Sequence, residues 1–266
     1  MPRRKRWNIS ATKNGIVKVD LFDWKYFHDF IYQKLLNYRT YVFRGHRCDD
    51  WRLESTLDRV ARITGSAFPM DRRQKHLAEF KYAIRGRRGA NPPRLETEND
   101  WWALGQHHGL ATPLLDWTTS PFVAAYFAFI GNKPNNTPRR VVWAISQLTV
   151  EQKSKEIRAD LTYKGRPPVI EFFKPLSDEN ARLVNQGGLF SRAPDNMTIE
   201  KWMESNFHVT DPKAKRWIAI GISMPNDNRA DALKSLNRMN INHLTLFPDL
   251  YGASTFCNTN LEIDKY

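Results

Sequence analysis

The sequence has little cysteine and no long apolar run, and both shortages narrow what the protein can be. Only Cys48 and Cys257 occur among 266 residues, with no Cys-x-x-Cys and no His-x-x-x-His pair. This pattern argues against a disulfide framework and against a zinc site. The longest apolar run covers residues 122–130, whereas a membrane-spanning helix needs about 20 residues. No apolar segment follows the basic start, so we expect a reducing, cytoplasmic setting with neither secretion nor membrane insertion.

The sequence also has few acidic residues relative to its basic ones. The chain has 41 Lys+Arg against 28 Asp+Glu, a formal net charge of +13 and a pI near 9.8. Such an excess favours nucleic acid, an anionic membrane surface or an acidic protein as partner, and a merely basic soluble protein is the alternative. A basic tail at residues 3–6 adds to the excess. Six further basic residues on a predicted helix and its following loop are candidate nucleic-acid contacts: Arg72, Arg73, Lys75, Arg85, Arg87 and Arg88.

Hydrophobic periodicity predicts the order of helices and strands. Helices are expected at residues 21–38, 71–85, 98–108, 122–130, 198–207 and 229–239. Strands are expected at residues 41–43, 141–145, 169–173, 181–185, 217–223 and 243–247. The two kinds alternate unevenly and without a repeat. The sequence therefore predicts an α+β fold in which a helical N-terminal portion packs on a mixed or antiparallel sheet.

Polar groups are densest in residues 106–120, between a predicted helix and the apolar helix that follows. A loop of this kind is a usual place for a site. Ser120 before Pro121 opens the apolar helix and favours an anion, although helix capping alone explains both residues. His107 and His108 are adjacent, so on a helix their side chains point about 100° apart and do not share a metal ion. One of them is a candidate acid–base group, and the other is expected to be structural.

Arg44 forms a second candidate site, between Phe43 and Gly45 at the end of a predicted strand. An arginine there presents a fork of donors to a phosphate, and the glycine lets the backbone stay close to the ligand. A surface salt bridge is the alternative interpretation of Arg44.

Together these segments resemble the FRG-domain family, named for the Phe-Arg-Gly tripeptide found here at residues 43–45. The resemblance continues through residues 51–59, 106–110, 114–118, 120–121 and 124–128, with weaker echoes at 180–182, 186–190 and 246–250. It implies an FRG-type domain at residues 40–252. Residues 1–39 are then a basic tail and an N-terminal helix packed on the core, and residues 253–266 are a C-terminal tail.

The order of these motifs in turn resembles that of the ADP-ribosyltransferases, which implies a sheet core of that type and NAD as a substrate. In this resemblance Arg44 holds the diphosphate, and Ser120 or Thr119 orients the nicotinamide ribose. A carboxylate or amide must hold the ribose 2′-hydroxyl and stabilise positive charge. The family's late Glu-x-Glu or Gln-x-Glu is absent, and the candidates for this catalytic role are Glu171, Gln186 and Asp116, with His108 as an acid–base group. The remaining residues expected at the NAD site are Gly45, Gln106, His107, Thr118 and Tyr126.

The resemblance implies NAD-dependent ADP-ribosylation of nucleic acid, RNA above all, without a metal. Small bacterial enzymes of this kind act as toxins in toxin–antitoxin or phage-defence systems, as does the mRNA-modifying toxin of a toxin–antitoxin–chaperone system. An antitoxin is therefore an expected protein partner. Two alternatives stay open: a non-catalytic module that binds a nucleotide or nucleic acid, and a metal-independent ribonuclease that uses His107 or His108 with Arg44.

Overall fold

The computed structural model describes residues 5–65, 67–131, 138–160, 166–175, 181–208 and 216–266. Within them the strands are β1 (Trp7–Ile9), β2 (Ile16–Leu21), β3 (Tyr41–His46), β4 (Leu114–Thr118), β5 (Arg139–Ser146), β6 (Glu171–Phe173), β7 (Gly188–Arg192) and β8 (Ala219–Pro225). These described strands form one open sheet in the order β1-β2-β8-β5-β3-β4-β7-β6. Only β2 and β8 are parallel neighbours, so the sheet is mixed.

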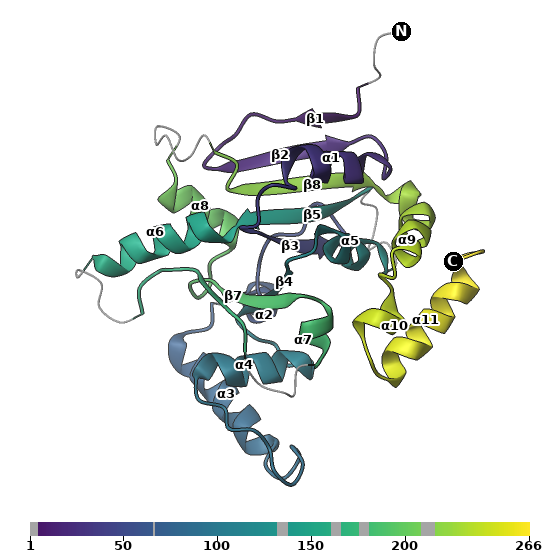
Figure 1. The fold of residues 1–266 in the computed structure, drawn as a ribbon. Helices are drawn as coiled ribbons and strands as arrows, with labels where there is room; N and C mark the ends of the chain where they lie inside the picture. Colours follow the sequence, from purple (N-terminus) through teal and green to yellow (C-terminus); the bar gives the residue numbers. More distant parts are fainter. Residues whose placement is uncertain (1–4, 66, 132–137, 161–165, 176–180, 209–215) are drawn as a thin grey trace.

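Helices surround this sheet, and the fold is mixed α/β (Figure 1). The helices with six or more residues are α1 (Tyr26–Lys34), α2 (Thr56–Ile63), α3 (Met70–Ala83), α4 (Glu98–His107), α5 (Pro121–Phe129), α6 (Gln147–Ala159), α8 (Ile199–Asn206), α9 (Arg229–Arg238) and α11 (Leu250–Glu262). Shorter ones are α7 (Ala181–Asn185), α10 (His243–Leu246) and the 3-10 turn η2 (Asn226–Asn228). Among the described helices, none combines the length and the apolar character that a membrane crossing requires.

Most of the expected elements are confirmed, but two predicted strands are wrong. Residues 181–185 form α7, and residues 243–247 contain α10. Asn242 caps α10, because its side chain accepts a hydrogen bond from the Thr245 amide at 3.0 Å. Short apolar runs do not distinguish a strand from a buried helix, which explains both errors.

The ends of the chain also differ from expectation. The N-terminal portion contributes two strands, β1 and β2, before a single helix, α1, that begins later than expected. Apolar residues alternate along β2, and Val17, Val19 and Leu21 are all fully buried on one face of the strand. Most of the expected C-terminal tail belongs to α11, and Ile263 and Tyr266 beyond it are buried against the core.

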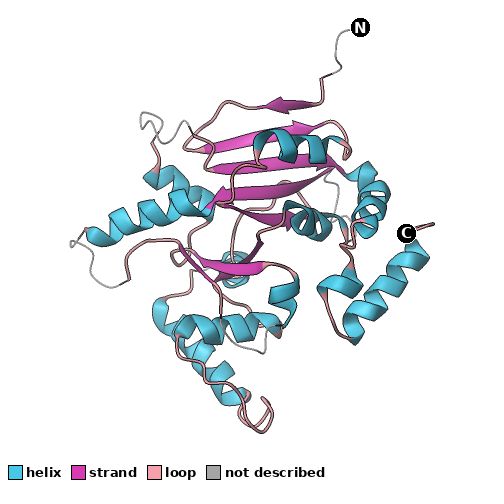
Figure 2. Ribbon diagram, in the orientation of Figure 1, coloured by secondary structure: helices cyan, strands magenta, loops and turns pink. Residues whose placement is uncertain are grey.

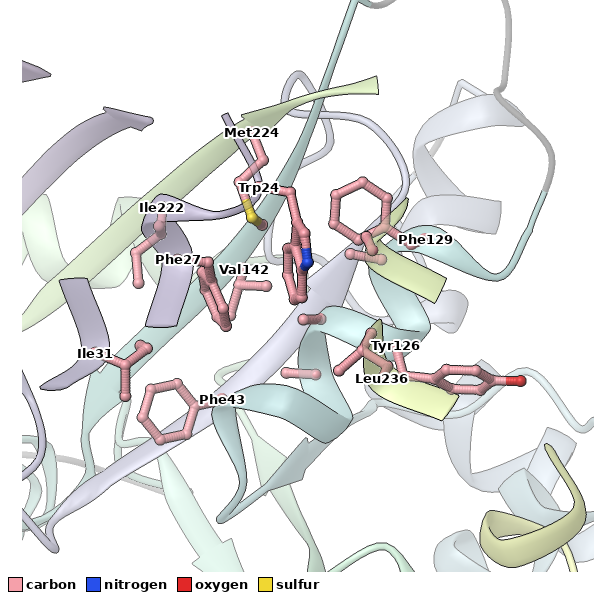
Figure 3. Close-up of a cluster of buried hydrophobic side chains, with 14 of the residues drawn as sticks. Trp24, Phe27, Ile31, Phe43, Tyr126, Phe129, Val142, Ile222, Met224 and Leu236 are labelled. Atoms are coloured by element: carbon pink, nitrogen blue, oxygen red, sulfur yellow. The ribbon is translucent and has the colours of Figure 1, made fainter. Parts of the chain in front are cut away.

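Two apolar layers cover the two faces of the sheet. In one layer, α1, α5 and α9 pack against inward side chains of β2, β3, β5 and β8. Figure 3 shows side chains of this layer, among them Phe27, Phe43, Phe129, Val142 and Leu236. The other layer packs α6 and α8 against the opposite face, with Val141, Trp143 and Ile145 alternating with the residues of the first layer along β5. This two-sided burial explains why β5 is apolar throughout.

The sheet nearly divides between β3 and β4. These two strands pair only through Phe43 and Thr118, whereas β3 pairs along its whole length with β5. Figure 2 shows the resulting upper and lower groups of strands. The lower strands β4 and β7 are covered by a third apolar cluster from α2, α3 and α4. The division leaves room beside β3 and β4 for a ligand.

Helix α5 is held at both ends, and it fixes the position of β3. Ser120 caps its start by accepting from the Val123 amide at 3.3 Å. At the other end the fully buried Arg140 donates to Ala128 O (2.6 Å) and Gly131 O (2.8 Å). Arg229 donates to Phe129 O and Ile130 O at 3.0 and 3.1 Å. Four carbonyl groups at this buried helix end are thereby satisfied.

Candidate functional site

A cavity of about 350 Å³ lies where β3 and β4 diverge. Its polar residues come from β3, β4, α4 and α7, and its apolar walls from α5, β7 and the segment before α11. Seven of the residues predicted from the sequence line it: Arg44, Gly45, Gln106, His107, Asp116, Thr118 and Gln186. Segments far apart in the sequence thus meet in one place. We define this as the Arg44 cavity.

The Arg44 guanidinium is held by two neighbours. Its Nε donates to His46 Nε2 at 3.0 Å, and its Nη1 donates to the Asp116 carbonyl at 2.7 Å. The Asp116 carboxylate lies further away, at 3.4 Å from Nη1. Nη2 makes no hydrogen bond to any residue that the structure describes. The side chain is 23% exposed, so this nitrogen remains available to a ligand.

His46 is a positioning residue that the sequence reasoning missed. It lies two residues after Arg44 on β3, so both side chains leave the same face of the strand. Burial, and then the Arg44 charge, lowers the pKa of His46 to about 3. The ring is therefore neutral at pH 7, and because Nε2 accepts from Arg44, the proton sits on Nδ1. The predicted strand ended at residue 43, whereas β3 continues to His46, so the alternation that pairs His46 with Arg44 was not recognised.

Strand β4 supplies the carboxylate of the cavity. Asp116 and Thr118 share one face of β4, whereas Leu115 and Trp117 enter the core on the other. The Thr118 hydroxyl donates to Gln186 O at 2.6 Å, and Gln186 Nε2 donates to Leu246 O at 3.2 Å. These bonds join β4 to the segment before β7 and to α10. They leave the Asp116 carboxylate 58% exposed.

Arg182 is a second arginine of the cavity, and sequence reasoning gave it no role. Its Nε donates to Asp249 Oδ2 at 2.9 Å, and its guanidinium lies 5.2 Å from the centre of the Phe247 ring. Phe247 and Arg182 both line the cavity. Their segments are two of the weaker family echoes, at residues 180–182 and 246–250. The co-occurrence of these echoes was the available signal, but their contact across 67 positions was not readable from the sequence.

Gly45 lines the cavity, yet its main constraint comes from packing. A Cβ atom at this position would lie 1.9 Å from Ala124 O and 2.6 Å from Ala128 N, both on the backbone of α5. Helix α5 therefore contacts the β3 backbone directly. From the sequence, the glycine was expected to let a ligand approach the backbone closely. The structure shows a second reason for glycine at this position, which is the direct contact with α5.

Five predicted site residues do not line the cavity. Glu171 lies on β6 and forms ion pairs with Arg158 and Arg166, at 2.6 and 3.5 Å. Tyr126 is fully buried and pairs with His243 Nδ1 at 2.5 Å, so it cannot contact a ligand. The remaining three also lie outside the cavity lining. His108 is exposed at the end of α4, Thr119 lies beside Gly187, and Ser120 caps α5.

One of the predicted nucleic-acid contacts is a structural residue. Arg73 is only 3% exposed, and its guanidinium binds Asp58 at 2.5 Å and the Phe68 carbonyl at 3.0 Å. A phosphate cannot reach it. The other predicted contacts remain on the surface of α3 and the following loop; Arg88 is partly buried, with Nη2 donating to Pro93 O at 2.7 Å, and Arg72, Lys75, Arg85 and Arg87 are exposed.

Two buried histidines predict a loss of stability in mild acid. Burial is the main cause that lowers the pKa of His46 to about 3 and of His243 to about 4, from an ordinary 6.5. The unfolded chain therefore binds more protons between pH 6.5 and 4, and stability present above this window is lost as the pH falls. Each histidine should contribute roughly 2–3 kcal/mol. Denaturant titrations across this window should show the decline, and the double variant His46→Gln/His243→Gln should flatten it. An unchanged slope would contradict the assignment.

Residues 39–137 match the family model described as the FRG domain. No curated protein and no solved structure matches the chain. The matched range contains β3 with Arg44 and Gly45, the Gln106 segment, β4 and α5. It thus supplies most of the polar wall of the Arg44 cavity. Residues 39–137 of the chain are therefore similar to the FRG domain.

Proposed function

We propose that the protein transfers ADP-ribose from NAD to a nucleic acid, with single-stranded RNA as the favoured acceptor. The observation that carries the proposal is the pairing of Arg44 with Asp116 in one cavity. An anchored guanidinium with a free nitrogen lies beside an exposed carboxylate. Recognition of a diphosphate and stabilisation of a cationic ribose need these two groups at close range.

The phosphate end of NAD would be held by arginine. Arg44 offers Nη2, and Arg182 adds a second positive charge whose orientation Asp249 fixes. Arginine suits this task because its planar fork binds two phosphate oxygens together. Within the described residues the cavity has one carboxylate, Asp116, against these two guanidinium groups, so an anion is the better-matched ligand.

The apolar walls suit the nicotinamide ring. Phe127, Phe247 and Phe190 line the cavity along with its polar groups. A flat heteroaromatic ring gains free energy by stacking on such side chains. The volume of about 350 Å³ is at the low end of the roughly 300–1,000 Å³ of small-molecule sites. The cavity therefore fits the nicotinamide riboside half of NAD, with the adenosine reaching outward.

Asp116 is assigned the charge-stabilising role in the transfer. The bond between the ribose C1′ and the nicotinamide nitrogen breaks, and its electron pair leaves with nicotinamide. The Asp116 carboxylate stabilises the oxocarbenium-like ribose and accepts a hydrogen bond from its 2′-hydroxyl. A nitrogen or oxygen of the acceptor forms the new bond to C1′ and loses its proton to Asp116 or water. Gln186, which is neutral, can orient the ribose but cannot take the proton.

Asp116→Asn tests this assignment against a matched control, Glu171→Gln. The first variant should slow nicotinamide release by about 10²–10³-fold, since it removes one charge at the reacting centre. It should fold normally, because Arg44 keeps its bond to the Asp116 backbone carbonyl. The second variant removes a carboxylate outside the cavity and should stay within about threefold of the wild type. Release of nicotinamide from NAD, with RNA as acceptor, is the measurement.

Three results would redirect the proposal. Equal activity of Asp116→Asn and wild type would remove the carboxylate from the mechanism. Binding of NAD without any nicotinamide release, with RNA, DNA or protein as acceptor, would favour a non-catalytic module. RNA cleavage without NAD that disappears in His107→Ala would favour the ribonuclease. A role as a toxin with an antitoxin stays a prediction from the family resemblance.

A further inference from the structure

A second, smaller pocket of about 220 Å³ adjoins the Arg44 cavity, and the two share Arg44, Gly45 and Phe127. We call it the arginine pocket. Besides Arg44, it is lined by Arg47, Arg52 and Arg59, with Glu54 and Trp51. All of these come from β3, from the segment after it, and from the first half of α2. The sequence analysis gave no role to Arg47, Arg52 or Arg59.

Positive charge in the arginine pocket is not neutralised. Arg47, Arg52 and Arg59 form no salt bridge with a carboxylate of the described residues. The one carboxylate of the lining, Glu54, is engaged from outside by Arg62, whose Nε lies 3.1 Å from both of its oxygens. His46, also in the lining, is neutral. Besides Arg44, which is engaged by Asp116 and His46, three guanidinium groups without a salt bridge to a described carboxylate therefore line one pocket whose single acid is already paired.

Two of these arginines are partly positioned in advance. The Arg47 guanidinium lies 5.3 Å from the centre of the Trp51 ring, a distance at which a cation is attracted to an aromatic face. Arg59 Nη2 donates to the Thr56 hydroxyl at 3.4 Å, within the first turn of α2. Arg52 is exposed at the mouth. The arrangement offers several N–H donors to one small anion, which is how phosphate is commonly recognised in proteins.

We propose that the arginine pocket binds a backbone phosphate of the single-stranded acceptor, next to the nucleotide that enters the Arg44 cavity. The inference rests on the proposed function, because it names the subsite for the acceptor of that reaction. The two pockets share Arg44, Gly45 and Phe127, so a phosphate in the arginine pocket would lie beside a nucleotide in the Arg44 cavity. Helix α3 lies on the far side of α4 from β3 and α5 (Figure 1).

The NAD diphosphate is the other source of the same phosphate chemistry, so the experiment must separate the two. One variant combines Arg47→Gln, Arg52→Gln and Arg59→Gln. Its matched control combines Arg72→Gln, Arg85→Gln and Arg87→Gln, which removes the same charge from the α3 face. Binding of a short single-stranded RNA is measured without NAD over a salt series. NAD affinity is measured separately by calorimetry, and thermal unfolding checks the fold.

The pocket variant should bind RNA at least about tenfold more weakly at low salt, and its log–log salt slope should be shallower by about 0.7, because one phosphate contact is lost. Its NAD affinity should remain within about threefold of the wild type, because Arg44 and Arg182 are intact. The control variant should keep the wild-type slope. If the triple variant fails to fold, the single variants Arg47→Gln and Arg52→Gln, both at exposed residues, should each bind RNA about tenfold more weakly at low salt through the loss of one charged hydrogen bond.

Four outcomes would overturn the inference. These are an unchanged RNA slope in the pocket variant, a lost slope in the control alone, a fall in NAD affinity instead of RNA affinity, and a wild type that binds no RNA at low salt. Because RNA binding is read without NAD, failure of the transfer reaction does not alter this result. A pocket that binds RNA in a protein that releases no nicotinamide would retain the subsite and reject the enzyme.

Discussion

Gly45→Ala is expected to prevent stable folding of the domain instead of adjusting ligand affinity. The new Cβ would lie 1.9 Å from Ala124 O and 2.6 Å from Ala128 N. Both atoms belong to the backbone of α5, so no side-chain rotation relieves the contact. Helix α5 cannot retreat, because Ser120 caps its start and Arg140 and Arg229 hold its last carbonyls. Overpacking of a core typically costs about 1–3 kcal/mol, and a backbone collision between two anchored elements should exceed that range.

Urea unfolding followed by circular dichroism measures this effect. Gly221→Ala is a matched control on β8 of the same sheet, where the three atoms nearest to the added Cβ all belong to the Trp143 side chain, the first at 3.2 Å. A rotating side chain can yield, so this control should lose less than about 1.5 kcal/mol. A Gly45→Ala protein with nearly wild-type stability would show that β3 and α5 are not in direct contact. The glycine of the tripeptide would then be explained by the ligand alone.

The difference between the two interpretations of Gly45 shows what the sequence can reveal. Amphipathic periodicity predicted α3, α8 and α9, because each repeats its apolar residues along a single face. The Ser120–Pro121 pair predicted the start of α5 correctly. Contact between β3 and α5 depends on distances between backbones that are set by the whole fold, and no local pattern encodes it.

The site was predicted in part for the same reason. The high content of polar residues identified the segment around Asp116. Its proline and its single carboxylate interrupt the apolar pattern, so the five-residue strand β4 was not predicted. Family resemblance then placed Arg44 and Asp116 in one site without giving their geometry. Glu171 was a candidate because it lies on a predicted strand. Strand order decides which strands border the cavity, and β6 is at the far edge of the sheet.

Arg44→Lys is expected to abolish most activity while the fold persists. Arginine makes two bonds to the protein, through Nε to His46 and through Nη1 to the Asp116 carbonyl, and keeps Nη2 for the ligand. The single ammonium group of lysine cannot occupy these three positions at once. NAD affinity should therefore fall by about ten- to a hundredfold, which corresponds to the loss of one charged hydrogen bond of roughly 1.5–3 kcal/mol. Nicotinamide release should fall further, since a displaced diphosphate also misplaces the ribose.

Calorimetric titration of NAD and a nicotinamide-release assay measure the two effects on the same preparation. Arg62→Lys is the matched control, because Arg62 is half-exposed, binds Glu54 and does not line the Arg44 cavity. It should leave both quantities within about twofold of the wild type. The NAD affinity and nicotinamide release of Arg182→Lys should lie between those of Arg44→Lys and Arg62→Lys, because Arg182 lines the cavity but is already paired with Asp249. Wild-type NAD affinity in a folded Arg44→Lys protein would contradict the phosphate contact. An Arg44→Lys protein that unfolds would instead show that Arg44 holds β3 and β4 together. The cavity would then need another residue to bind the phosphate. Arg182 is the remaining guanidinium among the described lining residues.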